Sequence, residues 1–145
     1  MKYSIWILFL IGMVGCATSP VPLTKSEPGT YNPALSSSLR TQTPQTGTLV
    51  VIRDSGMLGG MCKEVVSVDA QEIGYVHTSQ ELTVYLTPGQ HEVYVEIGEH
   101  SLCATGRTSA IFSINVGQTI VMDIHLSQGE ITITPQNLGN TSTAY

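Results

Sequence analysis

The sequence is poor in charge, and positive charge is the scarcest. Of its 145 residues six are Lys or Arg and eleven are Asp or Glu, which gives a formal net charge of −5. The six basic residues stand singly along the chain, so they form no stripe that would neutralise the phosphates of a nucleic acid. We therefore expect no nucleic-acid partner.

Motifs that carry catalysis or bind metals are also missing. The sequence contains no Cys-x-x-Cys and no Gly-x-Ser-x-Gly, and the Gly-rich stretch Asp54–Gly60 is not followed by Gly-Lys-Ser/Thr. The four histidines, His77, His91, His100 and His125, stand in four separate segments, without the spacing that brings two of them to one metal ion. We expect no catalytic residue, no metal site and no cofactor, and the chain is predicted not to be an enzyme.

Long apolar runs are absent except at the N-terminus. There, Lys2 precedes an apolar run of about ten residues that ends at Gly12. This run is too short for the roughly 20 helical residues that cross a bilayer, which favours an export signal over a membrane span. We expect residues 1–15 to be removed as a signal peptide.

The residues after this run are Met13-Val14-Gly15-Cys16, which resemble the lipobox of bacterial lipoproteins. The resemblance implies that Cys16 is the first mature residue and that it carries diacylglycerol and a fatty acid (palmitate being typical), so that the chain is attached to a membrane by its N-terminal lipid. Ala17 and Thr18 follow, not the Asp that retains such proteins in the inner membrane, and this implies the periplasmic face of the outer membrane.

Proline and hydroxyl residues dominate the next segment. Five prolines occur between residues 17 and 46, with Ser, Thr and Gln around them, and this composition disfavours a helix or a central strand. We expect residues 16–46 to be a flexible tether with a reach of ~30 Å. The polar residues 136–145 are expected to be a disordered tail.

Residues 47–135 show the period of two that is typical of β-strands, and no long helical period. Eight strands are expected, at Thr48–Arg53, Lys63–Asp69, Glu72–His77, Glu81–Leu86, Gln90–Ile97, Thr108–Val116, Gln118–Leu126 and Glu130–Thr134. The prediction is an all-β fold, a small antiparallel β-sandwich of about seven or eight strands.

Short connections are expected to make some of these strands antiparallel neighbours. Pro88-Gly89 has the chemistry of a type II turn and predicts a hairpin over Glu81–Ile97. The turns Asp69–Glu72 and Val116–Gln118 are equally short. Glu92 and Glu96 share one face of their predicted strand, two pleats apart, and are expected to form a solvated strand face.

The order of these features is similar to PEGA-type β-sandwich domains and to related uncharacterised domains of bacterial lipoproteins. The residues that carry the resemblance are Val66–Asp69 with Ile73-Gly74-Tyr75, then Leu86–Val93, then Val116–Gln118. The Glu and Ala that name the PEGA motif are missing, and Ala70 stands where a Gly is usual. The resemblance implies a fold and a location, with no common activity.

Three cysteines are present in the sequence. If Cys16 carries lipid, Cys62 and Cys103 remain as a pair in an exported chain, where disulfides persist. We expect these two to be bonded.

The surfaces proposed for a partner are apolar residues in loops and tyrosines on strands. The former are Met57, Leu58 and Leu102, and the latter are Tyr85 and Tyr94, which we expect on one face of the predicted hairpin. The leading hypothesis is a structural or binding module of the cell envelope whose partner is an envelope protein or a neutral glycan. A cell-wall enzyme or enzyme inhibitor and a carrier of a small ligand or metal are the alternatives.

Overall fold

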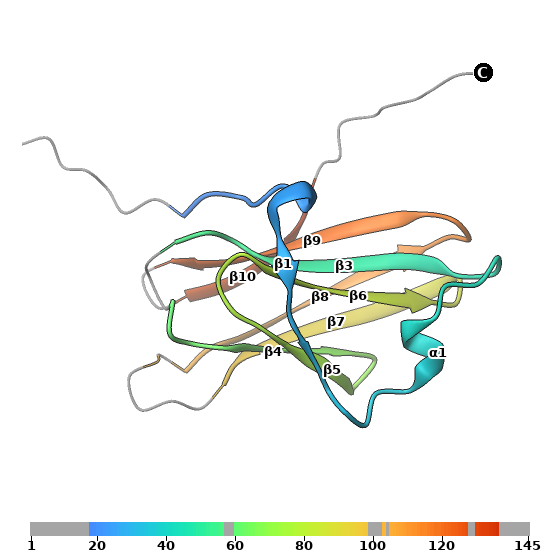
Figure 1. The fold of residues 1–145 in the computed structure, drawn as a ribbon, viewed down its shortest axis with the longest axis horizontal. Coiled ribbons are helices and arrows are strands. Elements are labelled where there is room, and N and C mark those ends of the chain that lie inside the picture. Colours follow the sequence, from blue (N-terminus) through green and yellow to red (C-terminus); the bar gives the residue numbers. More distant parts are fainter. Residues whose placement is uncertain (1–17, 57–59, 99–102, 104, 128–129, 137–145) are drawn as a thin grey trace, which may run out of the picture.

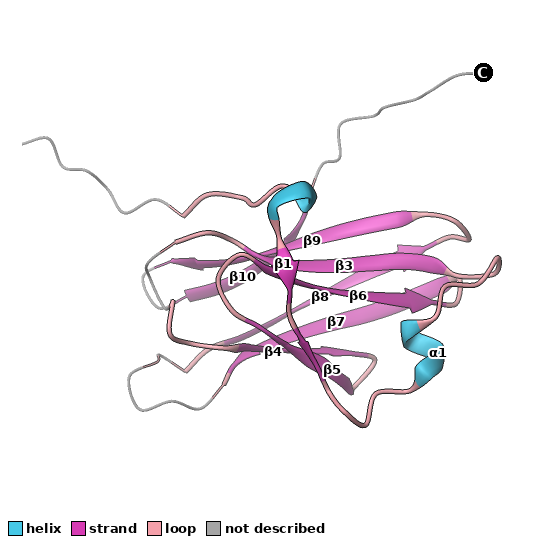
Figure 2. Cartoon of the chain, viewed as in Figure 1, coloured by secondary structure: helices cyan, strands magenta, loops and turns pink. Residues whose placement is uncertain are grey.

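The computed structural model describes residues 18–56, 60–98, 103, 105–127 and 130–136, which form a sandwich of two five-stranded sheets (Figure 1). Its regular secondary structure is almost entirely strand, with one short α-helix and one 3-10 turn at the periphery (Figure 2). The elements in order are η1 (Leu23–Lys25), β1 (Glu27–Pro28), β2 (Thr30–Tyr31), α1 (Ser37–Arg40), β3 (Gly47–Arg53), β4 (Glu64–Val68), β5 (Gln71–Val76), β6 (Gln80–Leu86), β7 (Gly89–Ile97), β8 (Arg107–Ile114), β9 (Thr119–Ser127) and β10 (Glu130–Pro135). The predicted all-β sandwich is confirmed, and the eight expected strands correspond to β3 through β10.

The sheets have the strand orders β1-β6-β3-β9-β10 and β2-β5-β4-β7-β8. Most neighbours are antiparallel, but β3 pairs with β9 in parallel over Thr48–Arg53, and β1 pairs with β6 in parallel. The prediction of a wholly antiparallel sandwich is wrong at these two pairs. Strands β3 and β9 run in parallel because the chain crosses between the sheets several times before β9 returns beside β3.

The hairpin predicted over Glu81–Ile97 does not form. Strand β6 lies in one sheet and β7 in the other, so Pro88-Gly89 is an arch between the two layers. The turn Val116–Gln118 is likewise an arch, from β8 to β9. In a hairpin and in an arch alike both strands turn their apolar faces to the core, so alternation alone does not distinguish them.

The third predicted turn does join antiparallel neighbours, β4 and β5. Asp69 and Ala70 have φ of 49° and 63°, the left-handed conformation at both central residues that a two-residue hairpin requires. The pairing then shifts by one residue at a bulge between Val66 and Ser67. Gly74, at φ 152°, lies opposite Val66, and a Cβ there would meet the Thr30 carbonyl oxygen at 2.2 Å, so only glycine fits.

Residues 18–46 lie on the sandwich, so the prediction of a flexible tether is wrong for the part of that segment that the structure describes. Strands β1 and β2 extend one sheet each, and Gly29 between them crosses from one layer to the other (Figure 1). Its N–H donates to the Glu81 carbonyl at 2.7 Å. The Tyr31 hydroxyl donates to the Thr83 carbonyl at 2.9 Å and accepts from the Thr83 N–H at 3.1 Å. The segment thus seals one edge of both sheets.

Prolines are compatible with this arrangement because the strands are short and lie at the sheet edges. Pro28 ends β1, whose outer side has no strand beside it. Val21 packs on the outer face of the same sheet with Val50 and Ile52 of β3 and Val121 of β9, which forms a second, small apolar cluster. The main core between the sheets consists of the inward apolar residues of β3 through β10, together with Cys62 and with Leu35 from the N-terminal segment. The folded unit therefore begins well before residue 47.

Within the described residues, no helix has both the length and the apolar character needed to cross a membrane.

Candidate functional site

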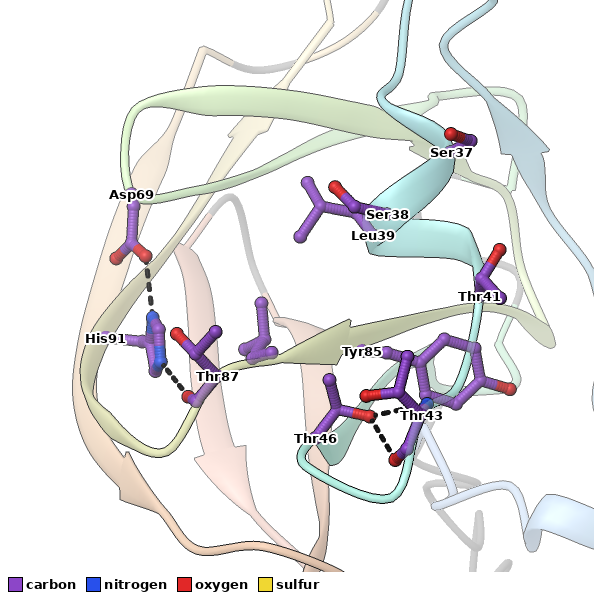
Figure 3. A pocket seen from close by; sticks show the side chains of 11 residues that line it. Ser37, Ser38, Leu39, Thr41, Thr43, Thr46, Asp69, Tyr85, Thr87 and His91 are labelled. Atoms are coloured by element: carbon purple, nitrogen blue, oxygen red, sulfur yellow. Dashed lines mark hydrogen bonds and ion pairs between the residues drawn. The ribbon is translucent and has the colours of Figure 1, made fainter.

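A pocket of about 500 Å³ lies at the end of the sandwich that carries α1 (Figure 3). Its walls are α1, the loop that leads to β3, the end of β6, the β4–β5 turn and the start of β7. Its lining residues are Ser37, Ser38, Leu39, Thr41, Thr43, Thr46, Asp69, Tyr85, Leu86, Thr87 and His91. This volume lies in the range of small-ligand sites.

The wall formed by the N-terminal segment is rich in hydroxyl groups and is held by local hydrogen bonds. The Ser36 side chain caps α1 by accepting from the Ser38 N–H at 3.3 Å. The Thr46 hydroxyl donates to the Thr43 carbonyl and accepts from the Thr43 N–H, both at 3.0 Å. Tyr85, half-buried, lies beside Thr43 and Thr46 across from Leu39 (Figure 3). The pocket therefore combines apolar and aromatic surface with neutral polar groups.

Asp69 and His91 form the ionisable pair of the pocket. His91 Nδ1 lies 2.6 Å from Asp69 Oδ2, and His91 Nε2 lies 2.8 Å from the Thr87 carbonyl oxygen. Asp69 Oδ1 also accepts from the Glu92 N–H at 3.0 Å. Both partners of the imidazole are acceptors, so the ring donates from both nitrogens when it is protonated.

The pKa values of this pair shift in the directions that its hydrogen bonds require. Burial by itself lowers the pKa of His91, but the bonds to Asp69 and Thr87 outweigh it and hold that pKa above 6.5. Burial likewise raises the pKa of Asp69, but the bonds from His91 and from the Glu92 N–H outweigh it and hold that pKa below 3.8. The pair thus connects the β4–β5 turn to the β6–β7 arch. Asp69 and the Thr87 carbonyl engage both His91 nitrogens, so neither nitrogen is left to accept a proton from a substrate. The geometry therefore does not suit a general base.

A second cluster of ionisable residues is buried between the sheets at the opposite end of the molecule. Arg53 forms ion pairs with Asp54, at 3.0 Å, and with Glu64, and all three side chains are fully buried. His125 Nδ1 lies 3.5 Å from Asp54 Oδ2. Burial raises the pKa of Glu64 to about 7, against the opposing effect of Arg53. Glu64 stands on the inward side of β4 with Val66 and Val68, whereas Glu92 and Glu96 on β7 are exposed, as predicted.

Cys62 and Cys103 are joined by a disulfide at this same end, with their Cα atoms 5.9 Å apart. The predicted pair is therefore confirmed in the structure. The bond links the strand that starts at Glu64 with the loop that follows β7, and His77 Nδ1 lies 3.3 Å from the Cys62 carbonyl oxygen. We call this part of the molecule, where β3, β5, β7 and β9 end, the disulfide end, and the part with α1 the pocket end.

The two tyrosines predicted on one face lie on different sheets. Tyr85 belongs to β6 and lines the pocket, whereas Tyr94 belongs to β7 and lies on the outer face of the other sheet. The single Tyr85/Tyr94 face was predicted from a hairpin that is in fact an arch, so it does not exist. Cys16, Met57, Leu58 and Leu102 lie outside the described residues.

The pocket was not predicted from the sequence, because its walls come from the segment expected to be a tether. The one available signal was Asp69 in the β4–β5 turn followed, 22 residues later, by His91 near the start of β7. Among the residues that the structure describes, no group of three or more His, Cys, Asp or Glu side chains converges as a metal site.

The sequence matches no protein-family model, and no curated protein matches it significantly.

Proposed function

We propose that this protein is a lipoprotein, anchored through Cys16 to the periplasmic face of the outer membrane, that acts as a binding module of the cell envelope. The sequence supports the anchor through Met13–Cys16, and a disulfide-bonded domain suits an oxidising compartment. The domain resembles the PEGA type in the residues quoted above, and this likeness belongs to the same proposal.

The pocket is the observation on which we base the choice of a binding function over a catalytic one. Its walls offer neutral hydroxyls, the Tyr85 ring and apolar surface, and its ionisable pair is engaged internally, Asp69 with His91. A ring face beside hydroxyl groups suits a neutral sugar, which presents both C–H surface and hydroxyls. A neutral glycan is therefore our preferred ligand class, since the formal net charge of −5 disfavours anionic polymers.

The test is a titration of the full-length, oxidised protein with a neutral N-acetylglucosamine trisaccharide, followed by NMR. Amide shifts should gather on α1, the 41–46 loop and the end of β6, and Tyr85→Ala should abolish them. Tyr94→Ala is the matched control, because it removes the same side chain from the other sheet. Equal loss in both variants, or saturable shifts confined to other surfaces, would refute the pocket as a glycan site. If no glycan shifts occur and a photocrosslinker at position 85 captures an envelope protein, the ligand is a protein instead.

A further inference from the structure

The N-terminal chain is fixed to the disulfide end of the sandwich by a short backbone clamp. The Ser19 N–H donates to the Ser55 carbonyl and the Ser55 N–H donates to the Ser19 carbonyl, each at 3.0 Å. The Ser55 hydroxyl also donates to the Ser19 carbonyl at 3.0 Å. Thr18 packs against Gly56, where an added Cβ would lie 2.7 Å from its Cγ2. Three hydrogen bonds therefore fix the chain just after the point where the lipid would be attached.

The distance from this clamp to Cys16 is short. Three peptide links separate Cys16 from Ser19, and an extended chain of that length spans at most about 10 Å. A lipid on Cys16 has its acyl chains in the bilayer, so the Ser19–Ser55 clamp must lie within about the same distance of the membrane surface. A flexible tether of ~30 Å reach would have left the orientation of the domain free, whereas this link does not.

We infer that the disulfide end of the sandwich rests against the bilayer and that the pocket end points away from it. This inference rests on the proposed lipidation of Cys16. Strand β9 runs from one end to the other over nine residues, or roughly 27 Å, so the pocket would open well beyond the lipid headgroups. In Figure 1 the described chain enters at the left, near the ends of β3 and β9, while α1 lies at the right.

The described surface of the disulfide end suits a lipid headgroup layer. Met61 is 75% exposed there, the largest exposed fraction among the large apolar side chains of the described residues. The cations Lys63 and Arg107 are exposed together with the anions Glu96 and Glu130, so the charge of these four residues is balanced although the whole chain is acidic. The acidic side chains of Asp54 and Glu64 are buried at this end and therefore add no repulsion. An apolar contact with balanced charge permits close approach to a bilayer.

The test uses the full lipidated protein in phosphatidylcholine vesicles that contain a spin label on the lipid headgroup. A fluorophore is attached through Glu130→Cys at the disulfide end or through Gln45→Cys at the pocket end, both exposed positions. The dye at position 130 should lose most of its fluorescence, and the dye at position 45 should lose almost none. Equal quenching at the two positions, or stronger quenching at position 45, would overturn the inference.

A third variant tests whether the short link is the cause. Fifteen Gly/Ser residues inserted between Ala17 and Thr18 add a reach of about 20 Å, so the dye at position 130 should regain its fluorescence. Quenching that persists after the insertion would contradict the clamp as the orienting device.

Mass spectrometry of the same samples separates the two proposals. Lipid on Cys16 with no quenching at position 130 refutes the orientation alone, whereas an unmodified Cys16 refutes the proposed function.

Discussion

Replacing Glu64 by glutamine should remove a specific part of the pH dependence of folding. The Glu64 carboxyl is fully buried between the sheets beside Arg53 and Asp54. Burial raises its pKa from 4.5 to about 7, and the attraction of Arg53 only partly opposes this. The folded protein therefore retains a proton that the unfolded chain releases, and this makes folding less favourable as the pH rises.

The magnitude follows from the two pKa values. Between pH 4.5 and 7 the folded state binds one more proton at Glu64 than the unfolded state, and each pH unit in that window lowers the free energy of unfolding by about 1.4 kcal/mol. Integrated from about pH 5 to about pH 8, the loss comes to roughly 2.5 kcal/mol. Glutamine has no proton to release, so the stability of Glu64→Gln relative to wild type should rise by this amount over the same range.

Urea unfolding of both proteins, with the disulfide intact, measures this difference at each pH. The pair Asp69 and His91 is present in both proteins, so its own pH dependence cancels when the two are subtracted. Glu96→Gln, which removes an exposed carboxyl from β7, is the control, and the pH-dependent difference from wild type should be larger for Glu64→Gln than for this control. A difference between Glu64→Gln and wild type that stays constant from acidic to basic pH would refute the buried, proton-retaining carboxyl.

Three further substitutions test the fold. Ala70→Gly should stabilise the protein by about 0.5–1 kcal/mol, because Ala70 has a φ of 63° that glycine adopts without strain, and thermal unfolding measures this. Tyr31→Phe should cost about 1–2 kcal/mol in urea unfolding, because the Thr83 N–H and carbonyl at the sheet edge both lose their partner. Cys62→Ser should cost about 3–4 kcal/mol and leave one alkylatable thiol at Cys103, since the bond closes a loop across 41 residues.

Each of these substitutions has an outcome that contradicts its reasoning. Destabilisation by Ala70→Gly would mean that the β4–β5 turn does not hold its left-handed conformation. Tyr94→Phe is the control for Tyr31→Phe, and equal losses in the two would show that the hydrogen bonds to Thr83 contribute nothing. Two alkylatable thiols in the oxidised wild-type protein would rule out the bond between Cys62 and Cys103.

The positions of the main strands were predictable because each has one apolar face. The alternation of Leu82, Val84 and Leu86 with polar residues identifies β6, and similar patterns identify the other seven long strands. Which sheet receives each strand was not predictable, since an arch at Pro88-Gly89 and a hairpin there turn the same faces inward. The prediction that Tyr85 and Tyr94 share one face was wrong for this reason.

Two further features escaped prediction for different physical reasons. The burial of Arg53 and Glu64 has no signal in the period of two, because these residues lie opposite each other in facing sheets and each makes the burial of the other tolerable. The N-terminal segment contains too many prolines for a long strand, yet two-residue edge strands and the Tyr31 hydroxyl suffice to fix it. The pocket depends on this segment. Neither the fixed position of the N-terminal segment nor the pocket could therefore be predicted from the period of two along the strands.

Both the proposed location and the proposed orientation of the domain depend on a lipid at Cys16. The mass of the N-terminal tryptic peptide from membrane-derived protein tests this anchor. We predict a peptide from Cys16 to Lys25 that carries a diacylglyceryl group and one further acyl chain, and that is absent from Cys16→Ser protein. A mature N-terminus at any other residue, or an unmodified Cys16, would contradict it.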